Sequence, residues 1–213
     1  SNPVDRTEKF MFDGERLIQH IIKQRYFEEE ISNEVNLSYS DNQVTVTTDY
    51  LTLVYTLNSE GYASQCVYSL SSQNRIYQFS YSAEGYLTGI VENIDNTEYS
   101  STSLTYENGD ITSISSKMNG LENKFIYEPG EESSTYHLPC LGLLEIHPLT
   151  FHIEALYAGL LGKDPRHFTM HSCPAGSNDE KTVYSYGFDK KGNPSRMICQ
   201  TTYAGGQASY YPY

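Results

Sequence analysis

Hydrophobic and polar side chains alternate along most of this chain. In the clearest copy, YQFSY at 77–81, an aromatic residue occupies every second position and polar residues lie between. A period of two is typical of a β-strand with one buried face. Gly85 then marks a turn, and Leu87 and Ile90 carry the apolar pattern beyond it. The stretch therefore predicts a β-hairpin.

The same unit recurs along the chain. An apolar triplet at alternate residues is followed within a few positions by a turn residue. The triplets are Val35-Leu37-Tyr39, Leu53-Tyr55-Leu57, Tyr77-Phe79-Tyr81, Thr102-Leu104-Tyr106, Asn123-Phe125-Tyr127 and Tyr184-Tyr186-Phe188, and their turn residues are Asn42, Gly61, Gly85, Gly109, Gly130 and Gly192. Repeated hairpins predict an antiparallel meander of roughly twelve to fourteen strands, and a sheet of that length curls or closes. We expect an all-β fold, an open or incomplete barrel.

Details of the hairpins can also be predicted. Asn108-Gly109 is the pair preferred in a two-residue type I′ turn, which needs positive φ. After the turns, apolar or neutral residues are three apart, as at Leu87/Ile90, Ile111/Ile114, Ala63/Cys66 and Pro194/Met197. An odd step in a strand of period two predicts a β-bulge or a local twist. Triplets that begin with Thr102 and Asn123 indicate edge strands or more open ones.

The N-terminal region is less clearly patterned. Residues 1–10 are polar and predict a tether. Leu17, Ile18, Ile21 and Ile22 fit helical spacing, but Phe12–Gly14 can be the first turn of the repeat, with 16–22 as the strand that follows. Short apolar runs cannot be assigned by periodicity alone. The repeat favours the strand.

Between residues 138 and 181 the repeat stops. Ile153, Leu156, Tyr157, Leu160 and Leu161 follow the spacing of an amphipathic helix, with Pro148 suited to its first turn and Gly162 to its end. Ala155 and Gly159 are small and four residues apart, which favours close packing of the helix on another backbone. The predicted organisation is one domain, 1–213, with hairpins over 12–137 and 182–213 and this helical insertion between them.

Composition excludes several classes of partner. The net charge is −13 and the sequence pI is about 4.8, so nucleic acid and anionic membrane surfaces are not expected partners. Residues on the face opposite the triplets are mostly hydroxyl and amide, as in 76–80 and 101–105, whereas a lipid-facing strand surface is apolar. No run of about 20 apolar residues is present. We therefore predict a protein that does not span the membrane.

Few residues suggest chemistry. His167, His171 and Cys173 have a metal-like spacing, but the prolines around them indicate a loop, so neither a metal nor a cofactor is predicted. His147 and His152 suit capping or surface positions. The acidic runs 28–30 and 131–132 suit solvated turns. No motif of a hydrolase, P-loop or dinucleotide site occurs, and we expect a protein that is not an enzyme.

Cysteine and tyrosine each leave alternatives. The four cysteines are Cys66, Cys140, Cys173 and Cys199. A Cys140–Cys173 bridge would close the insertion in an oxidising compartment, although the sequence does not fix the connectivity. The 20 tyrosines suit a core in which the hydroxyl reaches the rim. Stacking of sugar rings on exposed tyrosines is the alternative, and Tyr157, Tyr184 and Tyr186 are the candidate ligand-binding residues.

These hairpins, the helix end ALYAGLLGKDP at 155–165 and the final YSYGFDKKGNPSRM at 184–197 together resemble a family of bacterial envelope lipoproteins. That family is a domain of unknown function with a porin-like β fold, and its hairpins are similar to YD repeats. The resemblance covers nearly all of 12–203. It implies an exported protein at the outer membrane or cell surface, tethered through an acylated cysteine upstream of this chain. It implies no catalytic residues.

Three functions remain open at this point. A helix of about 20 Å is too short to cover a dozen strands, which favours a lipid or glycan ligand on the concave apolar face. A structural or interaction module at the cell surface is the alternative, and it predicts an interior filled by side chains. A hydrolase, the third, predicts His, Asp or Glu clustered in a cleft.

Overall fold

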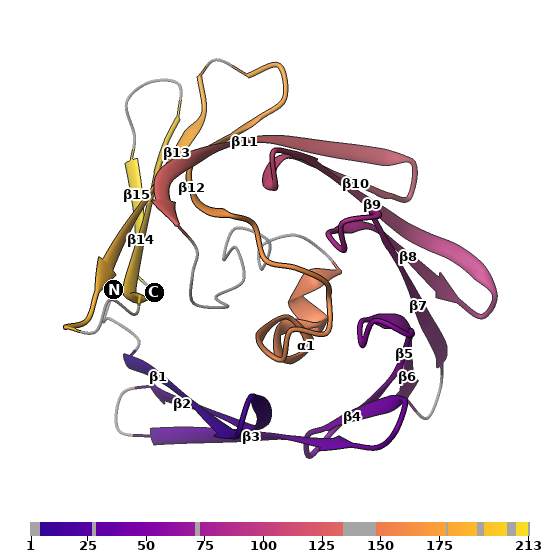
Figure 1. Ribbon diagram of the computed structural model, residues 1–213. Coiled ribbons are helices and arrows are strands. Elements are labelled where there is room, and N and C mark those ends of the chain that lie inside the picture. The colour runs from indigo at the N-terminus through magenta and orange to yellow at the C-terminus, as the bar shows by residue number, and fades with distance from the viewer. Residues whose placement is uncertain are drawn as a thin grey trace.

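Fifteen antiparallel strands follow one another around the molecule, each paired with the strands next to it in sequence (Figure 1). The computed structural model describes residues 5–26, 29–70, 73–133, 148–177, 179–190, 194–203 and 208–212. The strands are β1 (Asp5–Asp13), β2 (Arg16–Tyr26), β3 (Glu29–Tyr39), β4 (Gln43–Thr47), β5 (Thr52–Leu57), β6 (Ala63–Leu70), β7 (Gln73–Tyr81), β8 (Leu87–Ile94), β9 (Thr97–Glu107), β10 (Asp110–Met118), β11 (Leu121–Ser133), β12 (His167–Pro174), β13 (Lys181–Phe188), β14 (Pro194–Thr202) and β15 (Ala208–Pro212).

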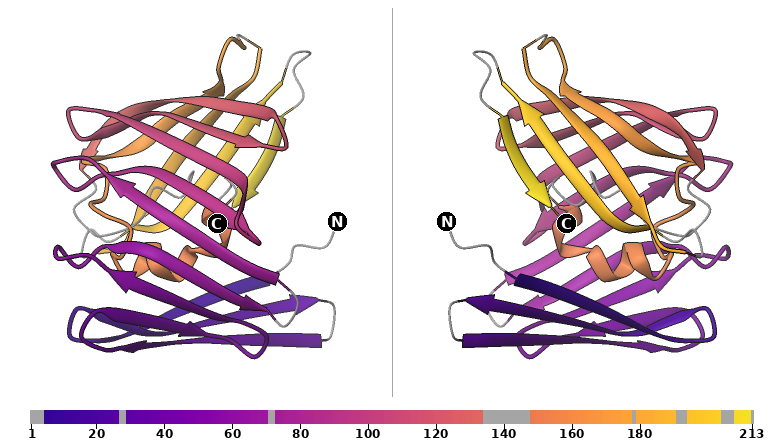
Figure 2. Two further views of the ribbon diagram at one scale, coloured as in Figure 1. Left: turned by 90° about the vertical axis from the view of Figure 1, so that its right-hand side faces the viewer. Right: turned by 90° about the vertical axis from the view of Figure 1, so that its left-hand side faces the viewer.

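The sheet curls around one short helix without closing. β1 and β15 are its two edges, and they lie on the same side of the molecule, next to the opening (Figure 1). The strands are tilted and wrap around the helix (Figure 2). The predicted fold, an all-β meander curled into an incomplete barrel with a helix late in the chain, is confirmed.

The hairpin turns have the predicted chemistry. Asn108 and Gly109 both have positive φ, 54° and 89°, and they alone separate Glu107 from its partner Asp110. This is the two-residue type I′ geometry. Gly61 and Gly85, in the two preceding turns on the same end of the barrel, also have positive φ, 85° and 91°.

The predicted bulges are confirmed by the strand registers. In the four hairpins with this odd step, the register slips by one residue just after the turn, so that one residue of the outgoing strand is skipped. The skipped residues are Ser64, Thr88, Thr112 and Ser195. The bulge lets both residues of a pair such as Leu87 and Ile90 face the core, where they are 2% and 0% exposed.

The N-terminal prediction was half wrong. Residues 5–10, predicted as tether, belong to β1, which pairs with β2 in register from Asp5↔Arg25 to Asp13↔Arg16. The strand assignment of 16–22 is confirmed, with the turn at Gly14 (φ 61°). Charged residues on both faces of β1, at 5, 6, 8 and 9, hide its strand character from a hydropathy pattern. Charged side chains are common on edge strands.

The late insertion is smaller than predicted. β12 (His167–Pro174) pairs with β11, so the segment predicted as a loop around His167 is a strand, and the meander resumes there. Gly130 is not a turn residue, because it lies inside β11, next to a register shift at Glu128/Pro129. Gly192 lies outside the described residues.

The helix is also shorter than predicted. A 3-10 turn, η2 (Leu149–Phe151), leads into α1 (Ile153–Tyr157). The chain turns out of the helix at Gly159, just after the C-cap residue Ala158, with φ 69°. Here Gly159 N donates to Leu156 O and Leu160 N donates to Ala155 O. These two bonds form a Schellman motif. The sequence indicated a stop at Gly162, three residues too late, because Leu160 and Leu161 continue the apolar spacing.

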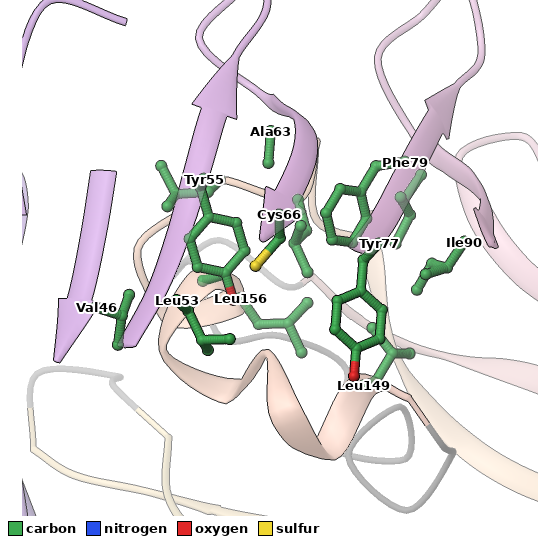
Figure 3. Packing of buried hydrophobic residues seen from close by; sticks show 14 of the residues in the cluster. Val46, Leu53, Tyr55, Ala63, Cys66, Tyr77, Phe79, Ile90, Leu149 and Leu156 are labelled. Atoms are coloured by element: carbon green, nitrogen blue, oxygen red, sulfur yellow. The ribbon is translucent and has the colours of Figure 1, made fainter. Parts of the chain in front are cut away.

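The core is formed between the concave face of the sheet and this helix. One cluster of buried side chains extends from β2 to β11 and includes Leu149, Ala155, Leu156, Leu160 and Leu161. Figure 3 shows strand residues of β5–β8 packed around α1. A second, smaller cluster contains Tyr184, Met197 and Cys199.

Two triplets begin with a polar residue, Thr102 in β9 and Asn123 in β11, but neither strand is an edge of the sheet. β9 and β11 each have a neighbour on both sides. Thr102 is buried at 3% exposure and bonds Ser116 across the β9–β10 pair, 3.2 Å between hydroxyl oxygens. Asn123 is exposed. The expectation of edge strands was therefore wrong.

After the helix, residues 160–166, here called the strap, cross the ends of three hairpins. Leu160 O accepts from Ala63 N at 2.7 Å, Lys163 N donates to Gly85 O at 2.9 Å, and Arg166 N donates to Gly109 O at 3.0 Å. Three extended residues span about 10 Å, and two strand spacings also amount to about 10 Å. One step of three strap residues therefore matches one hairpin.

Gly162 is the tightest point of the strap, which leads to a prediction. A Cβ at this residue would lie 2.6 Å from the Gly85 carbonyl oxygen, and its φ is +90°. We expect Gly162→Ala to lower the free energy of unfolding by about 3–4 kcal/mol, because the strap must move away from the hairpin. The matched control is Gly159→Ala, where φ is +69° and nothing lies within 4 Å. It should cost about 1–2 kcal/mol from backbone strain alone. Urea unfolding followed by circular dichroism measures both, and equal losses would contradict the steric role.

Candidate functional site

The segment 151–157 brings polar and aromatic side chains into the middle of the barrel. Phe151, His152, Glu154 and Tyr157 each contact a side chain of the sheet. The strands contacted are far apart in sequence, from β1 to β7. These contacts form two charged clusters and one hydroxyl–imidazole pair.

The first cluster is centred on His20 of β2. Its Nε2 lies 3.0 Å from Oε2 of Glu8 on β1, and its Nδ1 lies 3.0 Å from Oε1 of Glu154 on α1. The ring is fully buried and stacks on Phe10 at 4.3 Å. Burial by itself lowers the pKa of His20, but the hydrogen bonds and negative charges of Glu154 and Glu8 outweigh it and raise the pKa to about 9. A charged imidazolium thus ties the edge strand β1 to the inner helix.

The second cluster lies on β7–β9. Glu92, whose side chain is fully buried, lies 3.2 Å from Nη1 of Arg75 and accepts from the hydroxyls of Tyr77 at 3.2 Å and Ser100 at 2.7 Å. The Arg75 guanidinium is also 5.8 Å from the Phe151 ring centre and lies close to two tyrosines, Tyr68 and Tyr99. A buried carboxylate is tolerated where it is paired and hydrogen-bonded in this way. The cation–π contact connects the cluster to η2.

His152 provides the third connection. Its Nδ1 lies 2.7 Å from the hydroxyl of Tyr55, and its ring meets that of Tyr77 edge-on at 4.4 Å. Burial raises the pKa of Tyr55 well above the usual value for a phenol. Burial also raises the pKa of the Cys66 thiol to about 12, although a hydrogen bond from Tyr55 opposes the shift. Both groups are therefore neutral at pH 7, as suits a packed interior rather than a reactive site.

A separate surface is formed by the hairpin ends under the strap. We call the turns 58–62, 82–86 and 106–110, together with the strap, the rim. The first two turns are built alike and lie 24 residues apart: Asn58 N donates to Tyr62 O at 2.7 Å, and Ser82 N donates to Tyr86 O at 2.8 Å. Tyr62 and Tyr86 are thus equivalent, and both are half-buried.

Each rim tyrosine is supported by a tyrosine of the barrel wall. Tyr62 lies 5.3 Å from Tyr81, and Tyr86 stacks on Tyr106 at 4.9 Å between ring centres. Tyr81 is fixed in turn, because its hydroxyl donates to Ala63 O at 2.6 Å. The predicted role of tyrosine, an apolar ring with a hydroxyl that reaches the rim, is seen at this position.

Two exposed cations lie between the rim turns. Lys163 reaches over Gly85 and Arg166 over Gly109. Arg166 Nη1 donates to Asn108 O at 3.3 Å. Among the described residues no ion pair includes Lys163 or Arg166. The turn tips carry exposed carboxylates, so the rim presents groups of both charges: Glu60, Glu84 and Glu107.

The residues predicted as weak metal candidates are paired separately. His167 Nδ1 lies 2.9 Å from Oδ2 of Asp110, whereas His171 Nδ1 lies 3.1 Å from Oε2 of Glu128. No group of three potential metal ligands occurs within the part of the chain that the structure describes. His152 occupies the N-cap position of α1, which is one of the two predicted alternatives, although its side chain makes no capping hydrogen bond. The side chain is fully buried, so the surface alternative was wrong. His147 lies outside the described residues.

The three tyrosines suggested for ligand binding make internal contacts. The Tyr157 ring packs on Phe10 at 4.4 Å. Tyr184 is 3% exposed and shares a hydrogen bond of 3.0 Å with Ser172. The hydroxyl of Tyr186 donates to Thr169 O at 2.8 Å. Ligand binding by these residues stays a prediction.

Of the cysteines, Cys173 decides the outcome for the Cys140–Cys173 bridge that was left open. Cys173 is a free cysteine of β12, half-buried, and Cys140 lies outside the described residues. Cys66, also free, faces the core. Because β12 already pairs with β11, the strand is held in place by the sheet.

Sequence reasoning missed both charged clusters and the rim. His20 and Glu92 appear in the sequence as single polar residues at inward positions of strands, and nothing local identifies their partners. The rim could have been found, since Tyr62 and Tyr86 each follow the turn glycine at the 24-residue period.

The His20 cluster predicts how stability depends on pH. The folded-state pKa of about 9 lies above the ordinary histidine value of 6.5. The stabilisation is therefore complete below pH 6.5 and is lost as the pH rises through about 9. We expect the difference in unfolding free energy between the wild type and His20→Gln to fall by up to roughly 3 kcal/mol from pH 6 to pH 10. Urea unfolding at a series of pH values measures this difference, and a difference that stays constant or grows would refute the charged state of His20.

Comparisons with known proteins agree with this architecture. A porin-like protein from Bacteroides uniformis has a similar structure, with a TM-score of 0.89 and 26% sequence identity over 99% of this chain and 89% of that one. A porin-like protein from Bacteroides vulgatus, 12% identical, shares the fold with a TM-score of 0.59 over 98% of this chain and 96% of that one. No curated protein sequence matches the chain. Within the described residues, no helix has the length and apolar character needed to cross a membrane. Residues 12–196 match the family described as a domain of unknown function (DUF4595) with porin-like fold, and the chain belongs to that family.

Proposed function

We propose that this protein is a non-catalytic interaction module of the bacterial cell envelope, anchored through an acylated cysteine upstream of the chain, and that the rim is its interaction surface. The observation that carries the proposal is the regular construction of the rim, where wall tyrosines support two equivalent tyrosines and the strap adds two exposed cations. The envelope location is supported by the porin-like fold of the family.

The packing of the interior supports the rim over the concave face. A lipid or glycan on the concave apolar face needs surface that the protein itself does not cover. From β2 to β11 the described residues of this face pack in one cluster with the inner helix. The charged groups at its centre are buried and paired with each other, as in structural clusters. Ligand binding there, and hydrolysis, are the weaker alternatives.

The direction of β1 supports the same choice. β1 begins at Asp5 and reaches its turn at Gly14. In a meander alternate turns lie at the same end, so the β1–β2 turn is at the rim end and the start of β1 is at the opposite end. An anchor upstream of Asp5 would hold that opposite end near the membrane and present the rim outwards.

The anchor can be tested by fractionation. We expect the full-length precursor to appear in the membrane fraction and to incorporate labelled palmitate. Replacement of the upstream cysteine by serine should abolish the label and release the protein into the soluble fraction. A cysteine variant that stays membrane-bound and labelled would exclude the anchor.

The interaction surface can be tested by photo-crosslinking in the cell. A benzophenone amino acid placed at Glu84, an exposed tip of the rim, should form adducts with a specific partner. The control is the same group at Glu98, which is exposed at the opposite end. Adducts at Glu84 that exceed those at Glu98 by tenfold are the expected result. Equal yields at the two positions, or none at either, would refute the rim as the interaction surface.

A further inference from the structure

We propose that the rim binds a linear neutral polysaccharide, with one sugar ring against each of Tyr62 and Tyr86. This inference rests on the proposed function, since it names the ligand class of the same surface. Two rigid aromatic platforms at a regular spacing, surrounded by hydrogen-bonding groups of both signs, are the observation that leads to it.

The spacing of the two tyrosines is set by the sheet. They occupy the same position in successive hairpins, and two strand spacings place them about 10 Å apart. A linear polymer of rings presents its units at a regular interval, so it can contact both positions with the same chemistry. A compact single-ring ligand could contact only one of them.

The tyrosines are held in fixed orientations. Tyr62 N donates to the side chain of Asn58 at 2.9 Å, and Tyr86 N donates to the hydroxyl of Ser82 at 3.3 Å. Each ring also rests on a wall tyrosine and partly covers the turn glycine of the next hairpin, Tyr62 over Gly85 and Tyr86 over Gly109. Binding would therefore cost little ordering of side chains. A half-exposed phenol ring offers an apolar face and a polar tip, as a sugar ring requires.

The charges of the rim select a neutral ligand. Lys163 and Arg166 only donate hydrogen bonds, whereas the carboxylates of Glu60, Glu84 and Glu107 accept them. Sugar hydroxyls both donate and accept, so they satisfy either group. A polyanion would meet the three carboxylates and the protein's net charge of −13, and a polycation would meet the two strap cations. Neither is favoured over a chain of hydroxyl groups.

The test is affinity electrophoresis of the folded protein in native gels that contain soluble polysaccharides. The panel holds the neutral polymers β-glucan, xylan, mannan and galactan, with polygalacturonate as the anionic polymer. We expect at least one neutral polymer to retard the protein, and the Tyr62→Ala/Tyr86→Ala variant to lose at least tenfold in affinity. The variant Lys163→Ala/Arg166→Ala should lose severalfold in affinity. Because it removes only exposed side chains, it should leave the fold intact, so its loss of affinity reports on binding.

The matched control is Tyr50→Ala. Tyr50 is 83% exposed in the loop between β4 and β5, at the opposite end of the barrel, so its removal should leave retardation unchanged. Retardation by no neutral polymer, retardation by polygalacturonate alone, or equal loss in Tyr50→Ala would overturn the proposal. If rim crosslinks at Glu84 persist without retardation by any neutral polymer, the glycan assignment fails and the interaction surface stands. Loss of those crosslinks as well would remove both.

Discussion

The match between the strap and the hairpins is the constraint on which the rest of the structure depends. A three-residue step of extended chain is as long as two strand spacings, so Leu160, Lys163 and Arg166 can each bond a successive hairpin. Gly162 is required for the close approach, because a Cβ at this residue would lie 2.6 Å from the Gly85 carbonyl oxygen. The strap fixes the curvature of β5–β10 and holds the helix before it inside the barrel. It also delivers the chain to the start of β12.

With the helix held in place, the interior has to satisfy buried polar groups as well as apolar ones. The inner segment is short, and its apolar side chains, among them Leu149 and Leu156, belong to the core cluster. Charged and hydroxyl groups of the wall meet its other side chains, as in His20 with Glu154 and Arg75 with Phe151. Removing one partner of such a pair would leave the other buried group unpaired. The free-energy cost of that group is larger than the stabilisation that the pair provides. The clusters therefore specify where the helix lies as much as they stabilise it.

The sequence predicted what is local and periodic. Alternation of apolar residues, turn glycines and odd steps identified the meander, the type I′ turn at Asn108-Gly109 and the bulges, since these depend on neighbours in sequence. It failed where tertiary contacts decide. The start of β1 carries charges on both faces and was predicted as a tether. The helix end was misplaced because Gly159 lies within an apolar spacing, and β12 was predicted as a loop because of the prolines around it. The partners of His20 and Glu92 are set by the fold alone.

The third rim turn explains why the repeat changes character after β10. Asp110 stands 24 residues after Tyr86, where the two preceding repeats have tyrosine. Instead of an aromatic ring it supplies a carboxylate that accepts from His167 N at 2.8 Å and lies 2.9 Å from the His167 ring nitrogen. A tyrosine could not bond both groups of the incoming strand. The same position in the repeat thus serves two purposes. At Tyr62 and Tyr86 it forms a surface platform. At Asp110 it receives the end of the strap, where the sheet resumes. The platform is therefore limited to two rings along this part of the rim.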